Sequence, residues 1–451
     1  MARGKKKESA LTPEEKLAQA LVPVEEQPYQ VPENWGWTKQ GSVSKFLNGR
    51  AYKQTELLED DTLTPVLRVG NLFTNGSWYY SDLSLDESKY IKSSDLIYAW
   101  SASFGPFIWQ GGRVIYHYHI WKVELSEVLN KQFYYYWLMN DTERLKGGGH
   151  GTGMIHVTKE MMEQSIVPVP PLAEQQRIVD RIESLFAKLD EAKEKAQSVL
   201  DSFETRKAAI LHKAFTGELT AKWRAEHVVE MDSWNMLTLN DVAAYKKGPF
   251  GSSITKAMFV PKGANTYKVY EQGNAIRKTL DYGHYYISKA KYEELKGFAV
   301  APGDILISCA GTIGEAYKLP DNCEAGVINQ ALMRVRIFPN IHEQFFLYYF
   351  GGVVKGDVID KANGTAIQNI PPFKVMKAME IHLPTIEEQT EIVRILDSLF
   401  TKEQQAKEAA EAVLEKIDLL KKSILARAFR GELGTNDPTE ESALELLKSI
   451  L

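Results

Sequence analysis

The stretch that decides the fold is Pro170-Pro171-Leu172-Ala173-Glu174-Gln175-Gln176-Arg177-Ile178-Val179, because the chain contains it twice. The second copy reads Pro384-Thr385-Ile386-Glu387-Glu388-Gln389-Thr390-Glu391-Ile392-Val393. The match continues without a gap to Ala214-Phe215-Thr216-Gly217-Glu218-Leu219 in the first copy and Ala428-Phe429-Arg430-Gly431-Glu432-Leu433 in the second. A match of this length without a gap indicates an internal duplication.

Both copies have the pattern of a long helix. Each starts just after a proline, carries acidic residues in its first turn and reaches a glycine at its end, Gly217 or Gly431. Apolar residues alternate in steps of four and three, which is typical of a coiled-coil seam. The seam is interrupted at Arg206 in one copy and at Glu403 in the other, which are not equivalent positions.

Such helices can pair in two ways. One possibility is a coiled coil that joins two chains. The favoured interpretation is that the two copies pack antiparallel within one chain and give the molecule an approximate two-fold axis.

The regions before the two helices also resemble each other. The spacing from Trp35 to Gly49 equals that from Trp234 to Gly248. In each region an aspartate, Asp95 or Asp304, precedes an apolar strand that leads into a loop of small residues. The expected strands are short and mixed with a few helices, which predicts an α+β fold for both regions.

The expected architecture is therefore α+β, with two pseudo-symmetric domains separated by two long helices in an antiparallel coiled coil. Short helices from Glu14 to Leu21 and from Glu440 to Leu451 lie outside the repeat and serve either partner docking or packing. The expected divisions are an N-terminal arm with a short helix (1–30), a first domain (31–170), a central helical region (171–230), a second domain (231–383), and a distal helical region with the C-terminal helix (384–451).

Composition limits the class of protein. The chain has 451 residues, 44% of them hydrophobic, a net charge of −5 and two cysteines. Two cysteines are too few for a disulfide framework or a structural zinc site. No apolar run approaches the roughly 18 residues that span a bilayer, so we expect a cytoplasmic protein without a membrane partner. A net acidic chain that binds DNA would need a partner to supply much of the phosphate clamp.

The chain resembles the specificity subunits of type I restriction–modification systems. The resemblance rests on both helix modules and on Val31-Pro32-Glu33-Asn34-Trp35, Arg68-Val69-Gly70-Asn71 and Lys247-Gly248-Pro249-Phe250-Gly251-Ser252. It implies two target-recognition domains that each read half of a split double-stranded DNA site. It also implies helices that fix the gap and dock two methyltransferase subunits, and a motor and nuclease (restriction) subunit that joins for cleavage. S-adenosylmethionine, ATP and Mg²⁺ would act in those partners, and this chain would hold no cofactor or metal and no catalytic residue.

Loops rich in basic, amide, hydroxyl and aromatic side chains are the candidate DNA contacts, because those groups match phosphates and base edges. In the first domain the candidates are Lys45, Arg50, Tyr52, Lys53, Arg68, Asn71, Trp100 and Ser103. In the second they are Lys246, Lys247, Ser252, Ser253, Lys268, Thr312, Lys361, Asn363 and Gln368.

Two other functions fit parts of the sequence. The first is a stand-alone DNA adenine methyltransferase, because Asn369-Ile370-Pro371-Pro372-Phe373 nearly spells the Asn-Pro-Pro-aromatic motif, although Ile370 separates the amide from the prolines. The second is a coiled-coil scaffold that does not bind DNA. His117 and His119 lie in a strand-like run without a nearby acidic or thiol ligand, so packing or DNA contact is favoured over a metal site.

Overall fold

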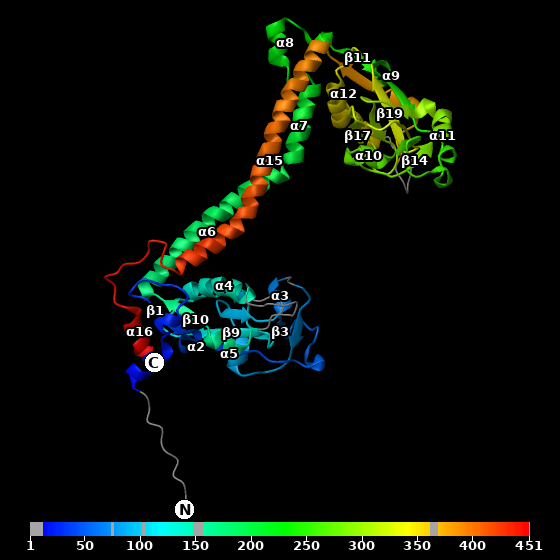
Figure 1. Cartoon of the computed structure of the whole chain (residues 1–451). Coiled ribbons are helices and arrows are strands. Elements are labelled where there is room, and N and C mark those ends of the chain that lie inside the picture. The colour runs from blue at the N-terminus through cyan, green and yellow to red at the C-terminus, as the bar shows by residue number, and fades with distance from the viewer. Residues whose placement is uncertain (1–11, 74–75, 102–104, 148–156, 361–368, 451) are drawn as a thin grey trace, which may run out of the picture. The chain divides into compact units, whose positions relative to one another are not determined.

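The computed structural model describes residues 12–73, 76–101, 105–147, 157–360 and 369–450 (Figure 1). Its contacts divide the chain into two compact units. The first unit combines Met1–Ala196 with Ala412–Leu451, and the second is Gln197–Glu411. Each unit therefore contains one α+β domain and takes helical residues from both copies of the repeat.

The first domain consists of two four-stranded sheets and a two-stranded ribbon. Its described strands are β1 (Gly36–Lys39), β2 (Ser44–Asn48), β3 (Thr64–Leu67), β4 (Tyr79–Ser81), β5 (Tyr90–Ile91), β6 (Leu96–Ala99), β7 (Gly105–Ile108), β8 (Val114–Tyr116), β9 (Ile120–Leu125) and β10 (Ile166–Val169). One sheet has the order β2-β9-β6-β7 and is antiparallel throughout. The other has the order β4-β3-β8-β5, with β3 parallel to β8. Strand β1 pairs with β10.

The second domain repeats this topology strand for strand. Its described strands are β11 (Asn235–Thr238), β12 (Ala243–Lys247), β13 (Thr266–Tyr270), β14 (Tyr286–Ser288), β15 (Ala299–Val300), β16 (Ile305–Ser308), β17 (Ala316–Lys318), β18 (Gly326–Ile328), β19 (Leu332–Ile337) and β20 (Glu380–Leu383). The sheets have the orders β12-β19-β16-β17 and β14-β13-β18-β15, and β13 is parallel to β18. The α+β prediction and the pseudo-symmetry of the two domains are confirmed.

The helix that follows the antiparallel sheet differs between the two domains. In the first domain α4 (Lys131–Gly147) is a single α-helix. In the second, α12 (Glu343–Tyr349) runs through a π-helical turn, η8 (Phe350–Val354), into α13 (Lys355–Asp360). The π-turn contains Gly351 and Gly352, and such turns often mark functional positions in a helix.

Short helices fill the remaining connections. The α-helices are α2 (Gln40–Val43), α3 (Val69–Phe73), α5 (Lys159–Gln164), α9 (Leu239–Val242), α10 (Gln272–Arg277), α11 (Lys289–Glu294) and α14 (Phe373–Lys377). The 3-10 helices are η1 (Val24–Glu26), η2 (Gln54–Glu56), η3 (Glu87–Lys89), η4 (Met231–Ser233), η5 (Gly251–Ser253), η6 (Lys256–Met258) and η7 (Lys296–Phe298).

The two helix copies run antiparallel within this single chain (Figure 1). The helices are α6 (Leu172–Asp201) and α7 (Phe203–Phe215) in the first copy and α15 (Ile386–Ala428) in the second. In the first unit, Lys421 near the end of α15 forms an ion pair with Asp190 of α6 at 2.6 Å. In the second unit, Arg206 of α7 forms an ion pair with Glu403 of α15 at 2.8 Å. The end of each copy therefore lies against the earlier part of the other, as the favoured interpretation predicts.

The first copy is not the single helix that its sequence predicts, because it breaks at Ser202. The guanidinium of Arg206 covers this break: it donates to the carbonyl of Val199 at 3.2 Å and hydrogen bonds the Ser202 hydroxyl. Its Nε also donates to Glu403 at 2.8 Å. The two polar interruptions of the seam are therefore partners. They do not align in the repeat because the helices meet in opposite directions.

A buried Glu-Gln pair anchors the start of α6. The side chains of Glu174 and Gln175 are fully buried. The Trp35 indole donates to Glu174 at 2.8 Å, and the Thr435 hydroxyl donates to it at 3.3 Å. Gln175 accepts the backbone N–H of Asn130 at 2.7 Å. These bonds fix the helix start to its own domain and to the tail of the other copy.

The start of α15 is anchored in the same way. Glu388 accepts the Trp234 indole at 2.9 Å and the Thr220 hydroxyl at 2.7 Å, and it forms an ion pair with Arg224 of α8 (Ala221–His227) at 2.5 Å. Each helix start thus binds the opening tryptophan of its own domain and a threonine from the tail of the other copy. Neutralisation of buried carboxylates requires such donors, which explains why these motifs recur together.

The short terminal helices pack in the first unit. Helix α1 (Pro13–Ala20) lies against α16 (Ala443–Ile450), and Lys448 forms an ion pair with Glu14 at 3.0 Å. Of the two roles expected for these helices, packing is therefore observed. Within the described ranges no helix combines the length and apolarity that crossing a membrane requires.

Candidate nucleic-acid interface

In both domains a glycine follows the first strand of the antiparallel sheet, β2 or β12. At this glycine the backbone passes close to the start of the turn that joins two later strands. A Cβ atom at Gly49 would lie closer than 3.0 Å to the carbonyl oxygens of Tyr116 and His117. A Cβ atom at Gly248 would lie still closer to the carbonyl oxygen of Asn329. Only glycine permits this approach of two backbones. The equal Trp-to-Gly spacings therefore mark one structural place in each domain, at the edge where the candidate DNA contacts lie.

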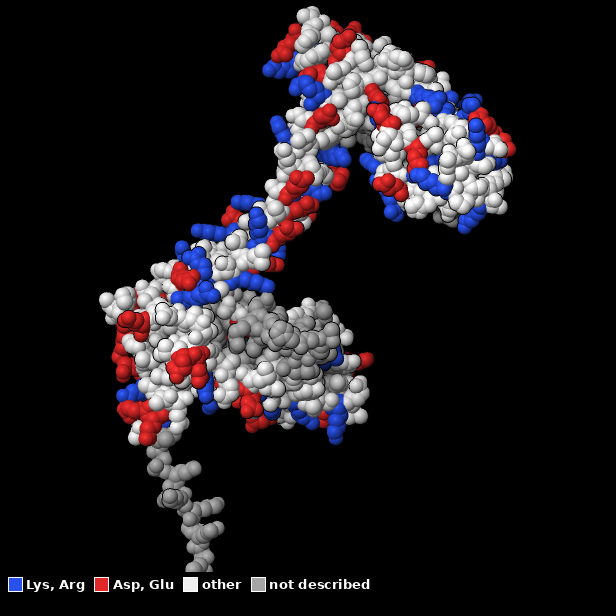
Figure 2. All heavy atoms as spheres, viewed as in Figure 1, with Lys and Arg blue, Asp and Glu red and all other residues white. Residues whose placement is uncertain are grey.

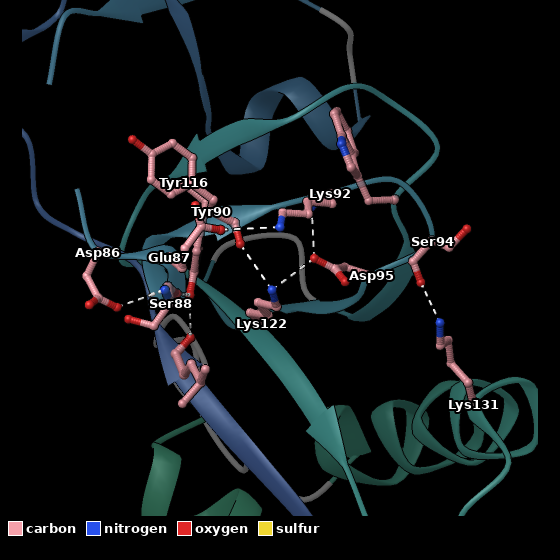
Figure 3. A network of polar contacts seen from close by, with 12 residues as sticks. Asp86, Glu87, Ser88, Tyr90, Lys92, Ser94, Asp95, Tyr116, Lys122 and Lys131 are labelled. Carbon is pink, nitrogen blue, oxygen red and sulfur yellow. Dashed lines mark hydrogen bonds and ion pairs between the residues drawn. The ribbon is translucent and has the colours of Figure 1, made fainter. Parts of the chain in front are cut away.

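A network of polar contacts ties the two sheets of the first domain to each other (Figure 3). Asp95 accepts the backbone N–H of Lys92 at 2.8 Å and forms an ion pair with Lys122 of β9 at 3.1 Å. Lys122 also donates to the Tyr90 carbonyl at 3.2 Å. Since Tyr90 belongs to one sheet and Lys122 to the other, Asp95 and Lys122 tie the sheets to each other.

The second domain has the same tie with different side chains. Asp304 accepts the backbone N–H of Ala301 at 2.8 Å, and Arg334 of β19 lies 4.0 Å from its carboxylate. Arg334 also donates to the Ala299 carbonyl on β15. The aspartate that precedes an apolar strand in each domain therefore has a structural role.

Three loops of the first domain meet at the turn 117–119, which joins β8 to β9. The backbone of Tyr118 donates to the Arg50 carbonyl at 3.1 Å, and the Trp100 indole donates to the Tyr118 carbonyl at 2.8 Å. The N–H of His117 donates to Leu67, next to Arg68, at 2.9 Å. Arg50, Arg68 and Trp100, predicted from separate loops, are thus brought together at one turn.

Aromatic rings run from the core of this domain to the same turn. Trp121, which is 1% exposed, stacks on Trp100 with ring centroids 5.8 Å apart. Trp100 contacts His119 edge-on at 5.0 Å, and His119 lies 4.0 Å from Tyr118, which is 38% exposed. A stack that is buried at one end and exposed at the other offers a rigid apolar surface with polar tips, which suits contact with bases.

The charges at this turn are partly neutralised. Arg50 forms an ion pair with Glu56 at 2.8 Å. Arg68 lies 4.3 Å from the ring centroid of Tyr79 and donates to a backbone carbonyl. Burial, together with His119 and Arg68, lowers the pKa of His117 to about 4. His117 is therefore neutral near pH 7 and can both donate and accept a hydrogen bond.

The second domain presents other side chains at the equivalent place, the turn 329–331 between β18 and β19. Gln330 is exposed there, and Lys246 and Lys247 are exposed at the adjoining end of β12. The ammonium of Lys246 lies 4.8 Å from the ring centroid of Phe298. Thr312 is exposed in the loop after β16, which is equivalent to the loop of Trp100. The second edge is therefore basic and amide-rich where the first is aromatic.

The other predicted contact residues fall in several environments. Lys53, Ser252 and Ser253 lie in exposed or half-exposed loops just after β2 or β12 of their own domain. Tyr52 precedes Lys53, and its ring centroid lies 5.3 Å from the Arg50 guanidinium. Lys45 is exposed in the middle of β2, opposite Glu124, and so lies away from the turn. Four predicted residues lie outside the described residues: Ser103, Lys361, Asn363 and Gln368.

Two of the predicted residues have structural partners. Lys268 is 4% exposed, and its ammonium donates to the Leu280 carbonyl. A cation that is buried and bonded in this way cannot reach a phosphate, so the expectation for Lys268 is corrected. Asn71 is 8% exposed, and its Oδ1 accepts the backbone N–H of Arg68 at 3.0 Å. It shapes the loop that carries Arg68.

Sequence reasoning missed Tyr118 and Gln330 and gave His117 and His119 only a general role. The run His-Tyr-His is a turn between two strands and not the expected strand. An exposed polar-aromatic run between two buried apolar strands could have indicated an edge loop. The face drawn in Figure 2 shows Lys and Arg interspersed with Asp and Glu, without one large basic patch.

The methyltransferase-like stretch has a structural role. Asn369 forms a backbone bridge with Ala310, and Ile370 is 5% exposed in the core of the second unit. Pro372 directly precedes α14. No group of three or more His, Cys, Asp or Glu suited to a metal is found among the residues that the structure describes.

Comparison with known proteins gives consistent matches along the chain. The sequence model of a family described as "Type I restriction modification DNA specificity domain" matches residues 32–200 and 231–416. The chain is 25% identical over 424 residues to the EcoBI specificity subunit of Escherichia coli, with 89% of this chain and 87% of that protein covered. It is 24% identical over 444 residues to the StySPI specificity subunit of Salmonella potsdam, with 90% of each covered.

Solved structures show the same fold. The HsdS subunit from Thermoanaerobacter tengcongensis superposes with a TM-score of 0.63 at 20% identity, covering 90% of this chain and 99% of that one. A structure described as "Structural basis underlying complex assembly and conformational transition of the type I R-M system" gives a TM-score of 0.61 at 21% identity, covering 90% of this chain and 100% of that one.

Proposed function

The chain belongs to the type I restriction–modification DNA specificity family, and on that premise we propose that its two domains each read one half of a split DNA target. It is the DNA specificity subunit of a type I restriction–modification system. The finer proposal is that the turn 117–119 reads one half-site and the turn 329–331 the other.

One observation carries this proposal: the two domains share one arrangement of strands and present different side chains at the candidate DNA-reading edge. The strand order, the close-approach glycine and the tie between the sheets recur in both domains. The side chains at the equivalent turns differ completely, with aromatic and imidazole groups in one and amide and ammonium groups in the other. A rigid frame with divergent loops is the arrangement expected of two modules that recognise different base sequences.

We infer that the chain itself performs no catalysis. In this proposal methyltransferase subunits supply S-adenosylmethionine, and restriction subunits supply the ATP- and Mg²⁺-dependent steps. The mixed surface charge supports the need for partners, because phosphate neutralisation by this chain alone would be modest.

The repeat supports two copies of the methyltransferase partner. Leu172 and Ile386 occupy equivalent positions in the first turn of α6 and α15, and each is 41% exposed. Two equivalent exposed apolar residues suit two equivalent docking contacts. Leu172→Asp and Ile386→Asp should each remove one methyltransferase subunit, measured as the mass of the complex, and the double variant should remove both. An unchanged mass in the double variant would refute this docking position.

Sequencing of methylated adenines tests the reading function. The chain and its methyltransferase are expressed in a host without other methylation, and a split motif is expected. Because Trp100 and Tyr118 lie on the first edge, Trp100→Ala and Tyr118→Ala should relax or abolish one half of the motif. Gln330→Ala and Thr312→Ala should affect only the other half.

Trp100→Phe is the matched control, because it keeps an aromatic ring and should retain more of the motif than Trp100→Ala. Methylation by the purified chain alone would instead support the methyltransferase alternative. The absence of any salt-dependent binding to duplex DNA, with the methyltransferase present, would support the scaffold alternative. A motif that stays unchanged in all four alanine variants would contradict the assignment of the two turns.

A further inference from the structure

A cavity of about 500 Å³ opens in the second unit, lined by residues of α7 and α15 and by residues of the second domain. Four lysines from four separate elements line it: Lys207 of α7, Lys278 after α10, Lys318 of β17 and Lys355 of α13. Its lining also includes one acidic residue, Glu315. Four ammonium groups around one hollow repel each other unless anions neutralise them.

The lysines differ in how they are neutralised. Lys355 pairs with Glu315, and Lys318 lies 3.0 Å from Glu343. Among the described residues, no carboxylate lies within 4.0 Å of Lys207 or Lys278. Two of the four cations therefore lack a protein counterion, and the cavity favours an anionic ligand.

The repeat shows that this deficit is specific to the second unit. Lys421 of the first unit is equivalent to Lys207. Each lies over an equivalent phenylalanine: Lys421 is 5.1 Å from the ring of Phe186, and Lys207 is 5.8 Å from the ring of Phe400. Lys421 is neutralised by Asp190 at 2.6 Å.

The position equivalent to Asp190 in the second copy is Gln404. Its amide donates to Glu408 of the same helix at 2.9 Å. The second unit thus has the lysine (Lys207) and the phenylalanine ring beneath it (Phe400), but it lacks a carboxylate at the position of Asp190. A replacement that leaves a cation without its counterion beside a cavity is the pattern expected of an anion site.

The walls of the cavity suit a phosphate group. Gly351 and Gly352 of the π-turn line it, and a Cβ atom at Gly351 would have no neighbour within 4 Å, so backbone is open to a ligand there. Gly314 also lines the cavity and belongs to the same loop as Thr312, a proposed base-reading residue. The cavity and the proposed base-reading loop of the second domain therefore share one segment of the chain, the loop between β16 and β17.

We propose that this lysine cavity binds a phosphate of the DNA backbone next to the half-site that the second domain reads. The inference rests on the proposed reading function, because it assumes that duplex DNA meets the Thr312 loop. Lys207 and Lys278 supply the positive charge, and Lys318 and Lys355 stay paired with their carboxylates. Contacts of this kind fix the register of a protein on DNA without reading its sequence.

The test measures the salt dependence of binding between the full chain, assembled with its methyltransferase, and a fluorescently labelled duplex. Each phosphate contact contributes about 0.9 to the slope of log affinity against log salt concentration. Lys207→Gln and Lys278→Gln should therefore each reduce the slope, by up to about 0.9. Gln404→Asp should act like Lys207→Gln, because it restores the counterion that the first unit has.

Lys421→Gln is the matched control and should leave the slope unchanged, because Asp190 already neutralises Lys421. Thermal unfolding checks that every variant is folded. The methylated motif should be the same in the Lys207→Gln, Lys278→Gln double variant as in the natural chain. A changed motif would overturn the proposal, since it would mean that these lysines read bases.

The remaining outcomes separate this inference from the reading function. If the natural chain binds duplex with a salt-dependent affinity that the variants share, only the cavity proposal fails. If the natural chain shows no such binding, the reading function fails with it. Calorimetry with ATP and with inorganic phosphate forms the other arm. Binding of either that is lost in Lys207→Gln, with an unchanged duplex slope, would assign the cavity to a free phosphate compound and overturn the DNA assignment.

Discussion

The ion pair between Arg206 and Glu403 should be strongly coupled, and its two single substitutions should differ. The side chains are 34% and 21% exposed, between the fully exposed pairs that contribute little and the buried pairs whose disruption costs several kcal/mol. Arg206→Leu leaves Glu403 unpaired in the seam and removes the bonds across the break at Ser202. We expect it to lower the free energy of unfolding by about 2 kcal/mol.

Glu403→Leu should cost less, about 0.5 to 1 kcal/mol, because Arg206 keeps its bonds to Val199 and Ser202 and stays partly hydrated. The double variant places leucine at both positions, as the repeat does at Leu189 and Leu420. It should be close to the natural chain in stability, since apolar side chains can replace a partly buried ion pair.

These four proteins, the natural chain, the two single variants and the double variant, form a double-mutant cycle. Urea unfolding followed by far-ultraviolet circular dichroism measures the free energy of unfolding of each. The coupling energy, the difference between the double variant and the sum of the two single variants, should be about 2.5 to 3 kcal/mol. Lys195→Ala is the control, because the side chains of the Lys195–Glu191 pair are 74% and 63% exposed and solvent screens their attraction, so this substitution should change the stability little. Additive single effects would refute the argument that the two interruptions of the seam act as partners.

Three further outcomes follow from the structure. Gly248→Ala should destabilise the second unit by about 2 kcal/mol or more through a backbone clash, whereas Gly356→Ala, which meets nothing within 4 Å, should be neutral or stabilising; melting temperatures compare them. The pKa of His117 is about 4 in the folded chain, against an ordinary value of 6.5, so the first domain should lose stability as the pH falls from about 6.5 through about 4, and a proton resonance of His117 that titrates near 6.5 would contradict this. Trp234→Phe removes a donor from a buried carboxylate and should cost about 1 to 3 kcal/mol in urea unfolding, whereas Trp223→Phe on α8 should change little; equal effects would contradict the anchoring role of Trp234.

The sequence predicted those parts of the fold that occur twice in the chain and are therefore visible as internal similarity. The helix copies, the two α+β domains and the equal spacings from Trp35 and Trp234 to their glycines are all visible as self-similarity. The glycine pattern was visible, but its reason was not, because the close approach involves a turn about 70 residues away in the chain. A close approach between two backbone segments that are far apart in the chain produces no pattern in the sequence around either segment.

The parts that sequence could not predict depend on pairing. The partnership of Arg206 with Glu403 requires the antiparallel register, and Arg206 also hydrogen bonds residues at the helix break at Ser202. Lys268 looked like a DNA contact because lysine is usually exposed, but its strand is central in the sheet and its ammonium finds a carbonyl inside. At the candidate site, composition selected Arg50, Arg68 and Trp100, but only the fold brings them to one turn.

Each unit contains helical residues from both copies of the repeat, and this predicts how the protein responds to a cut in its chain. A single cut at the exposed Val228 would give two fragments, and each would still bury side chains in both units. Thr220 and Arg224 of the leading fragment would hold Glu388 of the trailing one, while Thr435 would hold Glu174 in return. Such a nicked molecule should stay assembled, and two separately synthesised fragments should complement each other. We therefore expect the fold to tolerate a break in the peptide chain at this point, because each fragment supplies helical residues to both units.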